Sequence, residues 1–133
     1  MKYLILLLAI TASAQDYTIK SVIDTLAKVE SDGRTKVIGD NGQAVGLLQI
    51  HPIMVDECNR LSGSNKFTLA DRFNAKKSRY MATIYLSHQI NRYKRLKGVY
   101  PDELLLANSW NMGSIFAKQN LKYRVRYKTK KEI

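Results

Sequence analysis

An apolar periodicity near the start of the chain constrains its fold most strongly. Apolar side chains recur there at three- and four-residue spacings, the pattern of one helix face: Ile19, Val22, Ile23, Leu26 and Ala27. The pattern predicts a helix that is capped by Asp16 or Thr18 and runs to about Glu30. Asp32-Gly33 predicts its end, because glycine readily takes the left-handed conformation that stops a helix.

Glu30 occupies the next position on that apolar face. The predicted helix therefore directs a carboxyl group toward the core at its C-terminal end. Burial and the negative end of a helix dipole both disfavour an ionised carboxylate, so both raise its pKa. A carboxyl group that stays protonated near neutral pH can act as a general acid. Glu30 is thus the candidate catalytic acid; the alternative is an exposed residue at a frayed helix end.

The first fourteen residues have the three parts of an export signal in the right order. Lys2 supplies the positive charge, Tyr3 to Ile10 form a short apolar run, and Ala12-Ser13-Ala14 forms a small-residue cleavage site. The apolar run is shorter than the ~20 residues of a membrane-spanning helix. We expect a cleaved signal peptide at 1–14 and a secreted or periplasmic product. A buried N-terminal helix and an uncleaved anchor are the alternatives.

Composition indicates one folded domain with an anionic partner. The chain has 133 residues, of which 45% are hydrophobic and 25% charged, which is typical of a globular protein. We expect residues 15–133 to form a single catalytic domain with a basic C-terminal tail, and a monomer. The formal net charge of +11 favours an anionic partner, and the charge alone does not choose among wall polymers, anionic lipids and nucleic acid. We expect anionic cell-wall polymers, with no specific nucleic acid. The single cysteine, Cys58, excludes an intrachain disulfide, and no metal or cofactor site is visible in the sequence.

The residues after the first helix predict a small β-hairpin. Lys36 to Gly39 and Gln43 to Val45 read as short extended segments around Asp40-Asn41-Gly42. Asn-Gly is the strongest short hairpin signal. A hairpin of this size is too small to be stable alone, so it must pack on the helices beside Glu30. The predicted fold is therefore mainly α, of the α+β type, with one small β-hairpin lobe beside the cleft.

The rest of the chain predicts further helices from their start and stop residues. We expect helices at Pro52 to Leu61, with Ile53, Met54, Cys58 and Leu61 inward; at Asn74 to Lys97, with an inner stripe that ends at Tyr93 and Leu96; from Pro101 at the first helical position to about Asn111–Gly113; and at Ser114 to Asn120. Thr68 with Asp71 three residues later reads as a helix start. The tail Lys122 to Lys131 fits a strand or a helix equally well.

Three short motifs carry a family resemblance. They are Glu30-Ser31-Asp32-Gly33; Gly39-Asp40-Asn41-Gly42 running on to Gly46-Leu47-Leu48-Gln49-Ile50; and Trp110-Asn111-Met112-Gly113. In this order and at these separations they resemble the lysozyme-like superfamily that contains the SLT-type lytic transglycosylases and the goose-type lysozymes. The resemblance extends from about Tyr17 to Lys122. It implies cleavage of peptidoglycan at the β-1,4 bond between N-acetylmuramic acid and N-acetylglucosamine.

The resemblance also implies roles for single residues. Glu30 matches the catalytic acid/base, and Ser31 matches the residue that helps to hold it. Gly46 and Gln49 match the cleft floor, and Asn111 matches the Asn of the third motif. Asp40 matches an Asp that helps to place a water in goose-type enzymes, although Asp before Asn-Gly is also ordinary turn chemistry. Trp110 is a candidate for sugar stacking or for the cleft wall.

Three positions depart from the family pattern and concern the product type and the shape of the subsites. His51 stands where goose-type enzymes have a second Asp, Met112 where Gly or Ala is usual, and Trp110 where Tyr is frequent. The resemblance favours a lytic transglycosylase, with a hydrolytic lysozyme as the alternative. A non-catalytic cationic protein that binds cell walls, membranes or nucleic acid is the alternative from another class.

Overall fold

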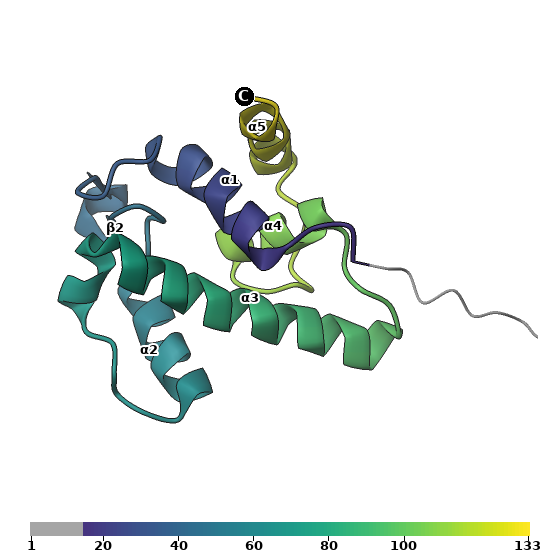
Figure 1. Ribbon diagram of the computed structural model, residues 1–133, viewed down its shortest axis with the longest axis horizontal. Coiled ribbons are helices and arrows are strands. Elements are labelled where there is room, and N and C mark those ends of the chain that lie inside the picture. Colours follow the sequence, from purple (N-terminus) through teal and green to yellow (C-terminus); the bar gives the residue numbers. More distant parts are fainter. Residues whose placement is uncertain (1–14) are drawn as a thin grey trace, which may run out of the picture.

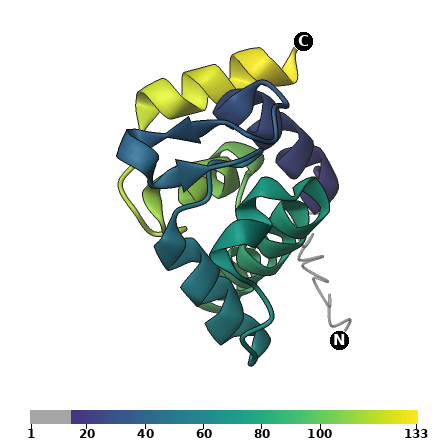
Figure 2. The ribbon, with the colours of Figure 1, turned by 90° about the vertical axis from the view of Figure 1, so that its left-hand side faces the viewer.

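The computed structural model describes residues 15–133, so the predicted export signal lies outside the described residues. Five α-helices dominate the architecture: α1 Ile19–Ser31, α2 Pro52–Ser62, α3 Ala75–Lys97, α4 Glu103–Met112 and α5 Leu121–Lys131. The long helix α3 extends along the molecule and contacts α1, α2 and α4 (Figure 1). Helix α5 lies at one edge, where it packs on α1 and α4 (Figure 2). The prediction of a mainly α fold is confirmed.

A two-stranded antiparallel sheet forms the predicted hairpin lobe. Strands β1 (Ile38–Gly39) and β2 (Ala44–Val45) pair with Ile38 opposite Val45, and the 3₁₀ turn η1 (Asp40–Gly42) joins them. All three turn residues have positive φ angles, which Asp, Asn and Gly tolerate best. A second 3₁₀ helix, η2 (Leu69–Phe73), precedes α3.

Helix α1 forms as its sequence predicts. The Thr18 side chain accepts a hydrogen bond from the Ser21 amide, and the Ser21 hydroxyl completes a capping box. Its apolar face is buried in the core with Leu48, Met81, Leu86 and Leu106. The helix stops at Asp32, which itself adopts the left-handed conformation, with φ of 54°. Gly33 follows with φ of 80°. The predicted end is confirmed.

The tail that fitted either a strand or a helix is the helix α5. Asn120 caps it by accepting a hydrogen bond from the Tyr123 amide. Tyr123 and Tyr127 are four residues apart, so they share one face of the helix, and both rings are buried in the core. A strand would also place the two rings on one face, so the spacing alone does not distinguish a strand from a helix. The tail is seen to be a helix because α5 packs on α1 and α4.

The helix predicted for Ser114 to Asn120 is wrong. This segment is an irregular loop with a turn. Side chains from neighbouring helices bind its amides: Ile115 N donates to Gln89 Oε1 at 2.9 Å, and Asn120 N donates to Asn108 Oδ1 at 2.7 Å. Such bonds compete with the helical ladder.

Smaller corrections concern the helix ends. Ile53 is not inward but 77% exposed, and Leu96 at the far end of the α3 stripe is 64% exposed. Asp102 caps α4 by accepting a hydrogen bond from the Leu105 amide, so Pro101 precedes the cap and does not take the first helical position. None of the helices within residues 15–133 is long and apolar enough to cross a membrane.

Candidate active site

Glu30 lies on the last turn of α1, where α5 crosses it. The Tyr123 hydroxyl donates a hydrogen bond of 2.7 Å to Glu30 Oε1. Burial raises the pKa of Glu30; the bond from Tyr123 and the nearby charge of Arg126 lower it and offset only part of that effect. The carboxyl group therefore holds its proton to a higher pH than a free glutamic acid does. This is the property that a general acid requires.

Ser31 fixes the end of α1 to the loop after the hairpin. Its hydroxyl donates to the Leu47 carbonyl at 2.7 Å and to the Ala27 carbonyl at 3.1 Å. The residue is only 3% exposed. Its hydrogen bonds thus fix the position of the last turn of α1, the turn that carries Glu30.

The loop after the hairpin depends on Gly46. Its φ is 83°, and a Cβ atom at this position would lie 1.9 Å from the Arg72 carbonyl oxygen. Its amide donates to the Val37 carbonyl at 2.8 Å. Only glycine satisfies both the backbone angle and the close approach.

Gln49 closes the base of the hairpin. Its side-chain amide donates to the carbonyls of Val37 (3.1 Å) and Gly46 (3.0 Å). Gln49 itself has a positive φ of 50°, a strained value for a residue other than glycine. Gly39 admits the other end of the amide, because a Cβ atom there would meet Gln49 Oε1 at 2.6 Å.

Arg72 supports the same loop from the opposite side. It is buried, and its guanidinium donates to the carbonyls of Gln43 and Ile50, at 3.0 and 3.1 Å. These bonds hold both ends of the returning strand and the loop that follows it. The sequence gives no pattern that marks this arginine, which lies in the short 3₁₀ helix η2 between α2 and α3.

Trp110 and Asn111 come from the end of α4. The Trp110 indole donates to the Leu48 carbonyl at 3.2 Å, and its ring meets Tyr85 edge-on at 5.6 Å between centroids. With 7% exposure, Trp110 offers a wall and little free ring face for stacking. Asn111 is exposed, and its Oδ1 accepts a hydrogen bond of 2.8 Å from the Asn120 side chain.

Asp40 and His51 form a pair on the hairpin side. His51 Nε2 lies 3.3 Å from Asp40 Oδ2, and both side chains are open to solvent. Asp40 is the first residue of the turn η1, with φ of 49°. His51 precedes α2 at its N-cap position.

These side chains line one hollow of about 260 Å³, which brings together residues from α1, the hairpin, α4 and α5: Glu30, Asp40, Gln49, His51, Asn111 and Arg126. A second hollow of about 240 Å³ shares Gln49 and Asn111 and continues to Met54 and Met112. A third, of about 280 Å³, shares Met54 and reaches Arg92 on α3. Consecutive hollows share lining residues, so the three are neighbours; we call this row of hollows the groove, and Glu30 lines its first hollow. Of the predicted site residues, Ser31 and Gly46 stand behind its surface.

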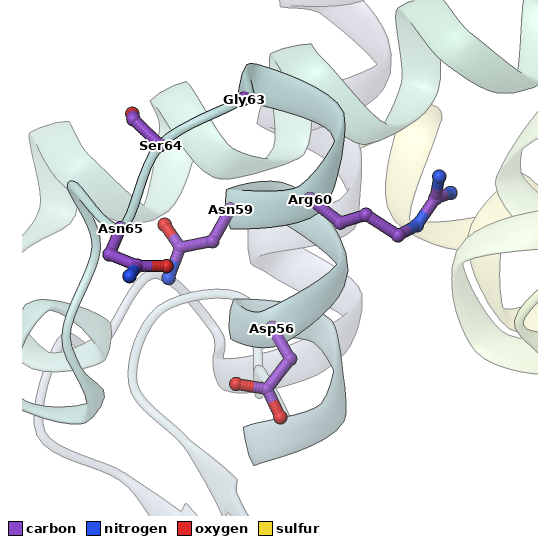
Figure 3. Close-up of a pocket in the computed structure, with 6 residues that line it drawn as sticks. All are labelled: Asp56, Asn59, Arg60, Gly63, Ser64 and Asn65. Carbon is purple, nitrogen blue, oxygen red and sulfur yellow. The ribbon is translucent and has the colours of Figure 1, made fainter.

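A separate hollow of about 430 Å³ lies at the far end of α2 and contains none of these groups (Figure 3). There Asn59 is occupied by the loop backbone, since it donates to the Phe67 carbonyl and accepts from the Phe67 amide. Arg60 points away from Asn59 and pairs with Glu57 (Figure 3). Because this hollow contains neither Glu30 nor any other residue of the three motifs, we place the site in the groove.

The sequence does not point to two residues of the site: Tyr123, which donates a hydrogen bond to Glu30, and Arg126, which lines the hollow. Both lie on α5, 93 positions or more from Glu30 in the chain. The Tyr123–Tyr127 spacing was the one available signal. Within residues 15–133, no three His, Cys, Asp or Glu side chains come together as a metal site.

Comparison with known proteins identifies a family. The family model described as the transglycosylase SLT domain matches residues 8–133. No curated protein and no solved structure matches the chain.

Proposed function

We propose that this chain, which belongs to the transglycosylase SLT domain family, cleaves peptidoglycan with Glu30 as its general acid and then its general base. Members of the family are lytic transglycosylases, enzymes that cleave the glycan strands of peptidoglycan. The single observation that carries the role of Glu30 is its position: its carboxyl group lines the hollow and is held there by the Tyr123 hydroxyl at 2.7 Å, partly buried so that its pKa is raised. The bond cleaved would be the β-1,4 link between N-acetylmuramic acid and N-acetylglucosamine.

The first step uses the protonated form of Glu30. The carboxyl group gives its proton to the glycosidic oxygen as the bond from that oxygen to C1 of the muramic acid breaks. Positive charge then develops on the sugar ring, with oxocarbenium character. Tyr123 holds the carboxyl group in place through its 2.7 Å hydrogen bond. The same bond stabilises the carboxylate that remains after the proton has left.

The second step uses the carboxylate. Glu30 takes the proton of the C6 hydroxyl group of the same sugar, and O6 bonds to C1. The product is an anhydro ring, no water is consumed, and Glu30 is again protonated. One carboxyl group is sufficient for this route, which is the lytic transglycosylase reaction.

The alternative product is a reducing sugar formed by hydrolysis. The Asp40–His51 pair lines the same hollow as Glu30 and could orient an attacking water. In that case Asp40 would have the role that the resemblance to goose-type enzymes implies, which is to help place the attacking water. In the transglycosylase route Asp40 serves the turn alone.

The enzyme works where peptidoglycan lies, in the periplasm or outside the cell. Residues 1–14 would be its cleaved signal, and the mature protein would be a monomer. Its exposed lysines and arginines would contact anionic wall polymers.

Such contact is electrostatic and screened by salt. Binding of an inactive variant to wall fragments should therefore weaken by about tenfold or more between 50 and 500 mM salt. Binding that is indifferent to salt would contradict this role of the charge.

The activity test compares the mature wild type with Glu30→Gln on purified peptidoglycan, with fragments identified by mass. Loss of the acid should reduce the rate by about 10³-fold. Anhydro-muramic ends would establish the transglycosylase route, and reducing ends the hydrolytic one. Asp40→Asn should leave the anhydro product unchanged. If wild type and Glu30→Gln release the same fragments, Glu30 is not the acid.

A further inference from the structure

One edge of α5, the edge beside Glu30, carries a row of cations. Lys122, Arg126 and Lys130 are spaced four residues apart, so they lie above one another on one side of the helix. Lys130 donates to Asp32 Oδ1 at the end of α1, at 2.7 Å. Within residues 15–133, neither Lys122 nor Arg126 lies within ion-pair distance of a carboxylate. The row therefore has one neutralised member and two unneutralised ones.

Arg126 is the member of this row that reaches the hollow. It lines the hollow together with Glu30 and Asn111. Its guanidinium lies 5.8 Å from the centre of the Tyr123 ring, and Tyr123 in turn holds Glu30. Figure 2 shows α5 along the upper edge of the molecule, next to α1 and the hairpin. From this helix Arg126 reaches the hollow that Glu30 also lines.

A permanent cation at this place disfavours the acid that the reaction needs. Its charge lowers the pKa of Glu30, and so removes part of the effect of burial. This disadvantage disappears when the substrate brings a negative charge of its own to Arg126. A planar guanidinium suits a carboxylate, since it can donate two parallel hydrogen bonds.

We propose that Arg126 forms a carboxylate-binding subsite beside Glu30, which takes a carboxylate carried by the muramic acid residue. That sugar offers two sources: the lactyl group, where no peptide is attached, and the stem peptide, where one is. Plain N-acetylglucosamine polymers have neither. The subsite thus selects anionic strands over neutral ones, and it rests on the proposed function.

The experiment removes the charge from each partner in turn. Wild type, Arg126→Gln and Arg126→Lys are assayed on peptidoglycan strands and on the same strands after their carboxylates have been converted to amides. Lys128→Gln is the matched control, because it removes one charge from the other side of α5. Thermal melts check that the variants are folded.

Wild type should prefer the carboxylate strands by about tenfold or more in kcat/KM, the range expected for a charged hydrogen-bonded pair. In Arg126→Gln the ratio should fall to about one, in Arg126→Lys it should be intermediate, and in Lys128→Gln it should stay as in wild type. The same ordering is expected for strand binding in the inactive Glu30→Gln background. A preference that persists in Arg126→Gln, or is absent from wild type, overturns the subsite while cleavage itself stands.

A third substrate separates the two sources of the carboxylate. Strands stripped of peptide by an amidase carry only free lactyl carboxylates. If the effect of Arg126→Gln persists on them, the lactyl group is the ligand; if it vanishes, the ligand is the stem peptide. A wild type that cleaves none of these substrates would refute the proposed function itself.

Discussion

At the scale of single residues, the site depends on a hydrogen bond between a partly buried carboxyl group, that of Glu30, and a buried tyrosine, Tyr123. Tyr123 donates to Glu30, and the burial of both groups raises the pKa of each. The hydrogen bond favours the ionised carboxylate, so it opposes the effect of burial on Glu30. The tyrosine thus fixes the direction of the carboxyl group and moderates its pKa at the same time.

Tyr123→Phe should separate these two effects. Without the donor the pKa of Glu30 rises further, so the pH limb that reports the protonated acid should move to higher pH. At the optimum kcat/KM should fall about tenfold, since a hydrogen bond to a charged group contributes about 1.5–3 kcal/mol. The pH profile of kcat/KM measures both quantities.

Tyr127→Phe is the matched control for this change. Tyr127 is also buried on α5, and it donates to Glu103 Oε1 at 2.8 Å, away from the groove. Loss of the Tyr127 hydroxyl should lower the free energy of unfolding about as much as loss of the Tyr123 hydroxyl does, and it should leave the pH profile of kcat/KM unchanged. A profile that shifts equally in both variants would show that the effect is structural.

At the scale of elements, the hairpin and its following loop hold the site by close backbone packing. Gly46 lies against the Arg72 carbonyl, whereas Gly42 in the turn has open space around it. Both glycines have positive φ angles, of 83° and 88°. They therefore carry the same backbone requirement but differ in the space around them.

Gly42→Ala should cost about 1 kcal/mol of unfolding free energy, the ordinary penalty of a left-handed alanine. Gly46→Ala should cost about 3 kcal/mol or more, since the loop must also move away from Arg72. Denaturant titration of both variants tests the difference. Equal losses would mean that the loop yields without strain, and would remove Gly46 as a support of the cleft floor.

At the scale of the whole molecule, the candidate acid works against stability. The raised pKa of Glu30 means that the folded protein binds more protons than the unfolded chain between pH 4.5 and the higher folded value. Stability therefore falls as the pH rises through that window, and the penalty remains above it.

Glu30→Gln should accordingly be more stable than wild type at pH 7, by about 1 kcal/mol, as is usual when a destabilised active site is relaxed. The gap should close below pH 4.5, where the wild-type carboxyl group is protonated in both states. Denaturant midpoints at pH 7 and pH 4 provide the measurement.

Asp32→Asn is the control, because the pKa of Asp32 is shifted in the opposite direction from that of Glu30. The bond from Lys130 lowers the pKa of Asp32, so its ionised form stabilises the fold above pH 3.8 and this contribution is lost as the pH falls. The variant should be no more stable than wild type at pH 7. A Glu30→Gln variant that is less stable than wild type at pH 7 would contradict the burial of the charge.

The sequence by itself determined what depends on neighbours within a few residues. Helix α1, its stop at Asp32-Gly33 and the position of Glu30 on its apolar face follow from local spacing and turn chemistry, as does the hairpin at Asn41-Gly42; the choice of Thr18 over Asp16 as the cap came from the structure. Only the tertiary structure decided that the tail is a helix, that residues 114–120 form a loop, and that Tyr123 and Arg126 reach Glu30. These outcomes depend on contacts between distant segments, and a spacing pattern carries no information about which distant face a side chain will meet.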